Sequence, residues 1–171
     1  NLPNDDDNQK LIIKILPIIN DGFYTIGSKL KNNLMISFTG DSSQNISVLS
    51  KMDDKNPQIF YVKMDVNDGC YSIFNVFNNL CLSTDRNSSQ KSSIEQKKFY
   101  NLDYQKWIIS SQEKGYFFLE LKSNLLRIDA SNKANNNMIQ LKLENFILYN
   151  PIKNQQLFSF NSIKVNEENS T

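Results

Sequence analysis

The residue types that most often perform catalysis are scarce in this chain. Histidine is absent, which excludes Ser-His-Asp and Cys-His nucleophilic chemistry and removes the commonest zinc ligand. Cys70 and Cys81 are the two cysteines, too few for a thiolate-only zinc site or a disulfide scaffold. The acidic pair Asp53-Asp54 lies in turn-like sequence, and paired carboxylates alone do not make a glycosidase. We therefore expect a protein that is not an enzyme and has no metal site and no cofactor.

The charge and hydropathy of the chain argue against two classes of partner. The 171 residues include 19 basic and 18 acidic side chains, for a net charge of +1. Nucleic-acid binders usually carry a one-sided basic field, so we expect no nucleic-acid partner. The most apolar stretch, residues 10–19, contains two lysines and a proline and is far shorter than the ~20 apolar residues of a membrane span. We expect no membrane span, and this stretch is a poor signal peptide because it follows the acidic cluster Asp5-Asp6-Asp7.

An internal repeat of about 47 residues is present in three copies, and it indicates which segments form the strands that would position a site. Each copy opens with a glycine followed by an apolar and aromatic run. The opening glycines, Gly22, Gly69 and Gly115, are 47 and then 46 residues apart. We interpret them as strand starts where the backbone needs a positive φ or a close approach. Because the chain has only 5 Gly and 4 Pro, we expect most turns to be made by Asn, Asp and Ser.

Each copy closes with a glutamine, one further residue and a large aromatic. Two more apolar runs lie between opening and closure, so each copy has four short candidate strands and the chain has twelve. The second runs are residues 33–37, 79–83 and 124–128, and the third runs are residues 45–49, 93–96 and 138–141. The closures run from Gln58 to Phe60, from Gln105 to Trp107 and from Gln156 to Phe158.

Three such units predict an all-β fold of the β-trefoil type. One four-stranded unit is too small to bury its own apolar face, so the three copies must share a core. We expect Phe60, Trp107 and Phe158 to meet there, near a pseudo-three-fold axis. The domain is predicted to span residues 18–163, with repeats at about 18–65, 66–111 and 112–163. We expect an N-terminal tail or linker at residues 1–17, polar over residues 1–9, and a polar C-terminal tail at residues 164–171.

The glycine-aromatic openings and the closing triplet Gln105-Lys106-Trp107 resemble the ricin-type β-trefoil lectin family over about residues 18–163. The other two closures keep the glutamine and have Phe in place of Trp. A second likeness is to the small β-trefoil haemagglutinin subunits of clostridial botulinum toxin complexes. It rests on the openings and on residues 145–150 and 156–158.

The family resemblance implies four ligand positions in each repeat. They are an Asp in the second strand, a Gln and a stacking aromatic in the third strand, and a polar pair that ends in the closing Gln. The implied Asp positions are Met35, Ser83 and Arg127, none of which is an acid. The implied Gln positions are Ser47, Glu95 and Gln140, and the implied stacking positions are Leu49, Lys97 and Lys142, none of which is aromatic.

The third copy is therefore the best candidate for a sugar site. Its candidate residues are Asp129, Gln140, Lys142, Gln155 and Gln156, to which the second copy adds Asp85. Asp129 and Asp85 lie two residues beyond the implied Asp positions and by strand alternation could point the same way. The alternative is that these two aspartates begin ordinary turns. The closing glutamines likewise have an alternative role, that of satisfying backbone groups beside the core.

The cysteines do not match the disulfide of the family, because the position of the expected partner of Cys81 is Phe99. Cys70 and Cys81 can pair only if their Cα atoms lie within about 7 Å of each other. We interpret them as two buried thiols.

Two functions are compatible with these features. The first is a carbohydrate-binding module of a secreted toxin, haemagglutinin or adhesin, which recognises galactose-type or sialylated cell-surface glycans outside the cell. The second is an adaptor that binds no sugar and docks other toxin or haemagglutinin subunits. A β-trefoil protease inhibitor, acting through a loop such as Asp103-Tyr104 or Lys133-Ala134, is a further alternative.

Overall fold

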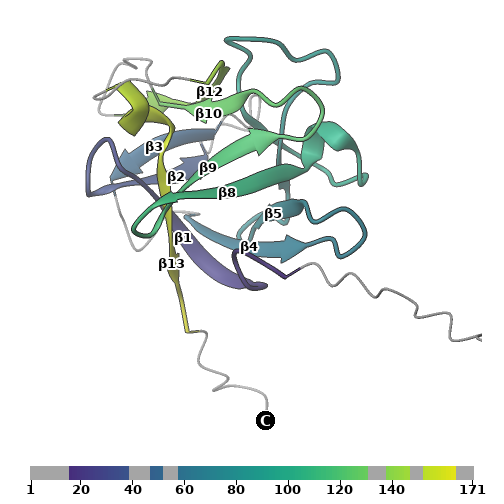
Figure 1. The fold of residues 1–171 in the computed structure, drawn as a ribbon, viewed down its shortest axis with the longest axis horizontal. Coiled ribbons are helices and arrows are strands. Elements are labelled where there is room, and N and C mark those ends of the chain that lie inside the picture. Colours follow the sequence, from purple (N-terminus) through teal and green to yellow (C-terminus); the bar gives the residue numbers. More distant parts are fainter. Residues whose placement is uncertain (1–15, 39–46, 52–57, 131–137, 147–151, 165–171) are drawn as a thin grey trace, which may run out of the picture.

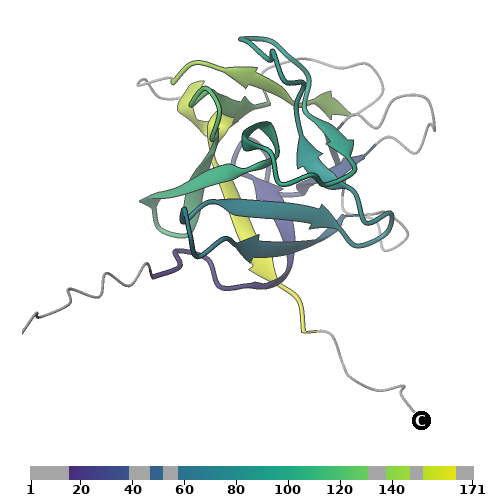
Figure 2. The ribbon, with the colours of Figure 1, turned by 90° about the vertical axis from the view of Figure 1, so that its right-hand side faces the viewer.

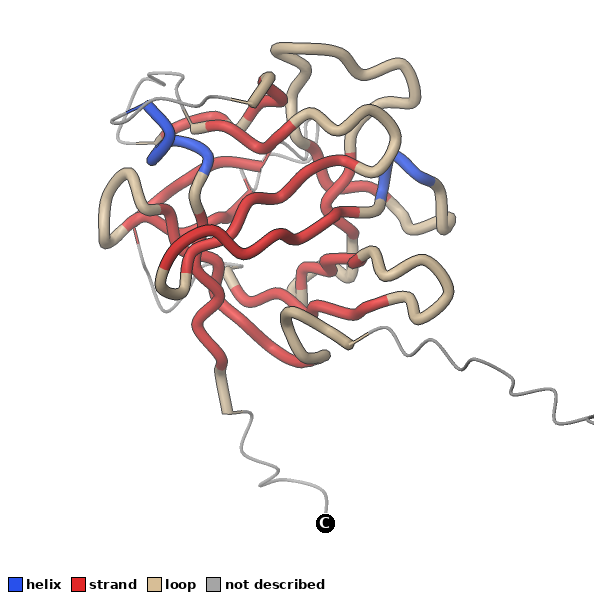
Figure 3. Tube along the Cα trace, viewed as in Figure 1, coloured by secondary structure: helices blue, strands red, loops and turns tan. Residues whose placement is uncertain are grey.

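The computed structural model describes residues 16–38, 47–51, 58–130, 138–146 and 152–164, and strands predominate in it (Figures 1 and 3). The predicted tails at residues 1–17 and 164–171 lie almost entirely outside the described residues. The strands are β1 (Gly22–Ser28), β2 (Leu34–Phe38), β3 (Ser47–Lys51), β4 (Ile59–Met64), β5 (Tyr71–Asn75), β6 (Cys81–Ser83), β7 (Glu95–Lys97), β8 (Trp107–Glu113), β9 (Tyr116–Leu121), β10 (Arg127–Asp129), β11 (Ile139–Gln140), β12 (Lys142–Glu144) and β13 (Phe158–Ser162). Two short 3₁₀ helices, η1 (Asp103–Gln105) and η2 (Ile152–Gln156), precede β8 and β13.

The first and last strands of the three copies form a closed barrel (Figures 1 and 2). Strand β1 pairs with β4, β4 with β5, β5 with β8, β8 with β9, β9 with β13, and β13 returns to β1. All six pairings are antiparallel. Closure leaves no sheet edge along this ring, which removes the usual liability of unpaired strands. This closed arrangement of three copies confirms the predicted β-trefoil.

The second and third strands of the copies form three hairpins, β2–β3, β6–β7 and β10–β12. The described residues contain thirteen strands, and twelve were predicted for the chain. The difference arises in the third copy, where the last hairpin strand is divided into β11 and β12 on either side of Leu141. The backbone of Leu141 is bonded to both other hairpins, since its amide donates to Ser47 O and its carbonyl accepts from Ile94 N.

The barrel encloses one apolar core, as the repeat predicts. Phe60, Trp107 and Phe158 are all fully buried and belong to this core. The polar group of Trp107 is satisfied, because its Nε1 donates to Leu82 O at 3.0 Å. Strand β4 shows the expected alternation, with Phe60, Val62 and Met64 buried and Ile59 and Lys63 exposed.

Turns are built largely by Asn and Asp side chains, as predicted. Asp65 Oδ1 accepts from Asn67 N after β4, and Asn124 Oδ1 accepts from Leu126 N after β9. The predicted positive φ occurs at Gly69 and Gly115, with values of 70° and 78°. Gly22 begins β1 without a positive φ, and the nearest contact of a Cβ there would be the Tyr24 ring at an ordinary 3.4 Å, so neither alternative of the prediction holds in the first copy.

Cys70 and Cys81 are free and buried, which confirms the interpretation as two thiols. Within the described part of the chain, no helix has the length and apolar character needed to cross a membrane.

Candidate functional site

Three backbone hydrogen bonds define which residues of the three hairpins are equivalent. Ser47 N donates to Ile94 O (2.8 Å), Ile94 N donates to Leu141 O (3.2 Å), and Leu141 N donates to Ser47 O (3.1 Å). These three residues are spaced 47 apart and close a ring. The residue after each of them pairs with the preceding strand: Val48 with Ser37, Glu95 with Ser83, and Lys142 with Asp129.

This register changes the position of the family's Asp. Met35 and Arg127 are equivalent to Cys81, whereas Ser83 is equivalent to Ser37 and Asp129, so the three sequence-based assignments do not share one register. If Ser83 marks the Asp position, the third copy has an acid there, Asp129. Asp129 ends β10 and is 1% exposed, so the hairpin and its surroundings fix the position of this carboxylate.

The positions expected for Gln140 and Lys142 are both displaced by two residues, to Lys142 and Glu144. Lys142, not Gln140, lies opposite Asp129, and it is half-buried. Gln140 lies before the junction at Leu141, where its Nε2 donates to Ser93 Oγ at 2.9 Å. In the second copy, the position predicted for a stacking aromatic is Lys97, which is paired with Cys81. The equivalent position in the third copy is Glu144, which is paired with Arg127.

The closing pair of the third copy is divided between surface and core. Gln155 is half-buried, and its carbonyl accepts from Ala130 N (3.0 Å), which places it beside Asp129. Gln156 is fully buried, and its Nε2 donates to Asn145 O at 2.8 Å. Gln58 and Gln105 are also buried and donate to backbone carbonyls, of Lys51 and Lys98. The three glutamines therefore share the backbone-satisfying role that was the alternative for them.

Asp85 is not the counterpart of Asp129. It lies beyond the end of β6, its side chain is 71% exposed, and it forms an ion pair with Lys97. Lys97 also pairs with Glu95 at 2.7 Å. The structure therefore brings Asp129, Lys142 and Gln155 together in the third copy and leaves Asp85 on another hairpin.

Sequence reasoning missed an exposed aromatic that follows β12. Phe146 is 50% exposed, and one face of its ring is covered by the Arg127 guanidinium, with Cζ 4.0 Å from the ring centroid. Arg127 also lies 3.6 Å from the ring centroid of Phe118 and forms an ion pair with Glu120 (3.0 Å). By strand alternation Arg127 shares a hairpin face with Asp129, and the buried Ile128 lies on the other face.

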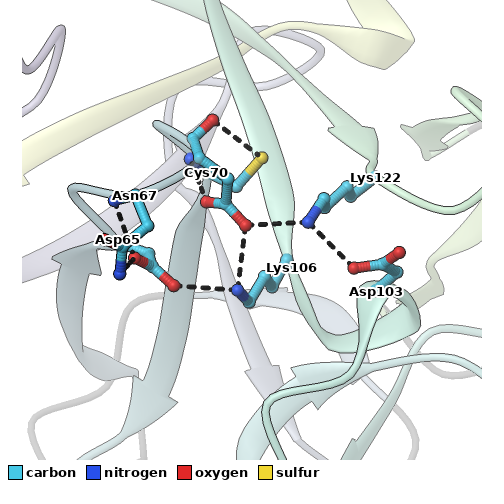
Figure 4. A network of polar contacts seen from close by, with 7 residues as sticks. Asp65, Asn67, Cys70, Asp103, Lys106 and Lys122 are labelled. Atoms are coloured by element: carbon cyan, nitrogen blue, oxygen red, sulfur yellow. Dashed lines mark hydrogen bonds and ion pairs between the residues drawn. The ribbon is translucent and has the colours of Figure 1, made fainter. Parts of the chain in front are cut away.

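A second polar cluster ties the β4–β5 turn to the start of β8 and the end of β9 (Figure 4). The Lys106 ammonium lies 2.9 Å from both Asp65 and Asp68, and Lys122 lies 2.7 Å from Asp68 and 2.9 Å from Asp103. Lys106 is the central residue of the closing triplet and is buried, and the cluster links all three copies, with Asp65 from the first and Lys122 from the third.

The charges of this cluster shift the pKa values of its members. Burial alone would raise the pKa of Asp68, but hydrogen bonds from Lys122, Lys106 and the Cys70 amide outweigh it and hold that pKa well below its ordinary value. The hydrogen bond from Lys106 lowers the pKa of Asp65 as well. The hydrogen bonds to Asp68 and Asp103 raise the pKa of Lys122.

A closed barrel of three copies with three hairpins defines a β-trefoil. Residues 56–142 match the family described as the ricin-type beta-trefoil lectin domain-like family, and the chain belongs to that family. No curated protein sequence matches the chain significantly.

Solved structures are similar in fold. The designed three-fold symmetric protein ThreeFoil is 15% identical with a TM-score of 0.70, and the match covers 84% of this chain and 100% of ThreeFoil. A mosquitocidal holotoxin is 20% identical with a TM-score of 0.75, covering 86% of this chain and 18% of the toxin. The Polyporus squamosus lectin, bound to the human-type influenza-binding epitope Neu5Acα2-6Galβ1-4GlcNAc, is 18% identical with a TM-score of 0.72, covering 85% of this chain and 50% of the lectin.

Proposed function

We propose that the chain is a carbohydrate-binding module whose ligand is held by the β10–β12 hairpin of the third copy. The observation that carries this proposal is the position of Asp129, which is paired with Lys142 and shares a hairpin face with Arg127, the residue whose guanidinium covers Phe146. A pyranose needs an apolar platform and a few fixed polar groups. Phe146 supplies the platform, Asp129 accepts hydrogen bonds from hydroxyl groups, and Lys142 and Gln155 lie beside it.

The ligand class follows from the charges around the hairpin. A neutral galactose-type sugar can use Asp129 as an acceptor, and the ammonium of Lys142 can in addition pair with the carboxylate of a sialylated glycan. The Polyporus squamosus lectin, whose structure contains a sialylated epitope, supports the choice of these sugars as first probes. We propose that the module acts outside the cell on cell-surface glycans as part of a toxin, haemagglutinin or adhesin. The similarity to a mosquitocidal holotoxin supports this role, and the match covers 18% of the toxin.

The test is a glycan array that presents galactose-terminated and sialylated glycans to the whole chain. Asp129→Asn keeps the shape of the side chain and removes the charged acceptor, so we expect it to lose most of the signal. Asp85→Asn is the matched control, because Asp85 is exposed on another hairpin, and we expect it to bind as the wild type does. Equal signals from the two variants and the wild type would refute the hairpin site. Phe146→Ala should also weaken the signal.

The second candidate is an adaptor that docks other protein subunits, and one exposed apolar cluster favours it. Phe77 is 75% exposed, and its ring centroid lies 6.0 Å from that of Phe38. The neighbouring side chains of Val76 and Ile59 are also exposed. Exposed apolar groups that gather in one place often mark protein interfaces. A stable complex of the chain with a toxin or haemagglutinin subunit that is lost in Phe77→Ser but kept in Asp129→Asn would favour the adaptor over the lectin.

A further inference from the structure

A row of four aromatic side chains crosses the outer wall of the barrel, away from the β10–β12 hairpin. Phe23 of β1 is paired with Tyr61 of β4, and their ring centroids are 5.1 Å apart. Tyr61 is paired in turn with Phe74 of β5, whose ring lies 5.0 Å from that of Phe99. All four side chains are half-buried, so the row presents two adjacent pairs of partly accessible aromatic rings.

Two adjoining pockets lie along this row and are together called here the β4–β5 groove. Their volumes are about 490 and about 420 Å³, and both are lined by Lys63 and Phe74. Each volume is within the range of small-molecule sites, roughly 300–1,000 Å³. The groove therefore has room for a chain of linked rings along the aromatic row.

Polar groups stand at the edges of the β4–β5 groove, and two of them are fixed by other contacts. Asp21 Oδ1 accepts from Met64 N at 2.8 Å, and Asp65 is held by the Lys106 ammonium at 2.9 Å. Lys63 and Asn101 are exposed and add donors. Prepositioned acceptors and donors around an apolar floor reduce the entropy that a polar ligand loses on binding.

The pairing of the strands decides between a peptide and a sugar as the occupant. An extended peptide would gain most from adding a strand to a sheet edge. Here β4 is paired with β1 and β5, and β5 is paired with β4 and β8, so the wall of the groove consists of strands that already have two neighbours. An oligosaccharide needs no backbone edge, since its ring faces stack on aromatics and its hydroxyls bond to side chains.

We propose that the β4–β5 groove is a second carbohydrate site, which takes an oligosaccharide of two or more rings on Phe74 and its aromatic neighbours. It is separate from the hairpin site of the proposed function and uses no residue of the third copy. The two sites would allow one module to contact a branched or extended glycan at two points, which raises the apparent affinity through a high effective concentration.

The test maps backbone amide shifts of the ¹⁵N-labelled chain during titration with a tetrasaccharide of two Galβ1-4GlcNAc units. We expect saturable shifts at Tyr61, Ser72 and Phe74. Phe74→Ala should weaken this binding about tenfold, because one aromatic contact contributes up to about 1.5 kcal/mol. Tyr100→Ala is the matched aromatic control, since Tyr100 is 64% exposed and does not line the groove, and it should bind as the wild type does.

If Phe74→Ala does not fold, Lys63→Ala tests binding in the groove instead, because Lys63 is exposed and its removal leaves the core intact. We expect it to weaken the groove shifts several-fold, and Asp129→Asn to leave them unchanged. Absence of groove shifts at millimolar tetrasaccharide, unchanged affinity in both groove variants, or groove shifts produced by a protein subunit and by no glycan would each overturn the proposal. Groove shifts that persist in Asp129→Asn separate this site from the hairpin site.

Discussion

Asp129 of β10 lies directly opposite Lys142 of β12, in the register that Ser83 and Glu95 have in the second copy. Of the three equivalent positions, Ser37, Ser83 and Asp129, only the last carries a charge. A buried carboxylate costs free energy unless its surroundings satisfy it, so the surroundings of Asp129 must differ from those of the two serines.

Lys106→Met should destabilise the fold. The side chain of Lys106 is 6% exposed, and its removal leaves Asp65 without that partner and Asp68 with Lys122 alone among the lysines. Breaking a largely buried ion pair by removing one partner costs about 2–4 kcal/mol of unfolding free energy. Urea denaturation measures this loss. Lys29→Met is the control, because its ion pair with Glu113 is on the surface and should contribute about 1 kcal/mol or less. A loss as small as that of the control would contradict a stabilising role for Lys106.

Acid should weaken the same cluster in a predictable direction. The pKa of Asp68 is lower in the folded chain than in the unfolded chain, because the hydrogen bonds from Lys122 and Lys106 outweigh the effect of burial. Its stabilising contribution is therefore fully present above the unfolded value of about 4 and is lost as the pH falls below it. As the pH falls from about 4, the unfolding free energy should decrease more steeply in the wild type than in Asp68→Asn. Parallel pH profiles of the two proteins would contradict this assignment.

Leu125→Asn should stabilise the protein. Leu125 is 61% exposed and has a φ of 61°, a left-handed conformation that is unfavourable for a branched side chain. Asn79 has the corresponding place in the second copy, with a φ of 57°. Asparagine tolerates this conformation, so we expect a gain of about 0.5–1 kcal/mol, measured as a higher denaturation midpoint. Leu102→Asn is the control, because Leu102 is also exposed but has a φ of −98°, and it should give no gain. An equal change in both variants would show that exposure alone is responsible.

Cys81 should be unreactive in the folded chain. Burial raises the pKa of its thiol to about 11, and the side chain has no solvent exposure, so little accessible thiolate is present near neutral pH. Alkylation with iodoacetamide at pH 8, followed by mass spectrometry, should label this residue only as fast as the protein opens or unfolds. Labelling as fast as that of a free thiol in native conditions would contradict the buried position.

The barrel could be predicted from the sequence because its framework residues repeat. The apolar periods of the openings and closures, and the aromatics Phe60, Trp107 and Phe158, all depend on the shared core, so each copy retains them. The role of Gln105 also follows from its position beside the core, where its side chain satisfies the backbone of Lys98 and Tyr100.

The register of the third hairpin could not be read from the sequence. The match of Asn79-Leu80 to Asn124-Leu125 is misleading, because Leu125, not Asn124, takes the left-handed position of Asn79. Residues downstream are then displaced, and the implied Asp position falls at Arg127, two residues before Asp129 on the same face of the strand. Phe146 was missed for a different reason. It lies beyond the last hairpin strand, outside the repeat pattern, and its contact with Arg127 depends on the folded hairpin.

The most direct test of the hairpin site is titration calorimetry of the whole chain with lactose and with Neu5Acα2-6Galβ1-4GlcNAc. We expect at least one of these sugars to bind the wild type and Asp85→Asn equally. Asp129→Asn should bind it at least about tenfold more weakly, the effect of losing about 1.5 kcal/mol from charged hydrogen bonds. Binding by Asp129→Asn that equals the wild type, with the fold intact by circular dichroism, would contradict the assignment of the ligand to the β10–β12 hairpin.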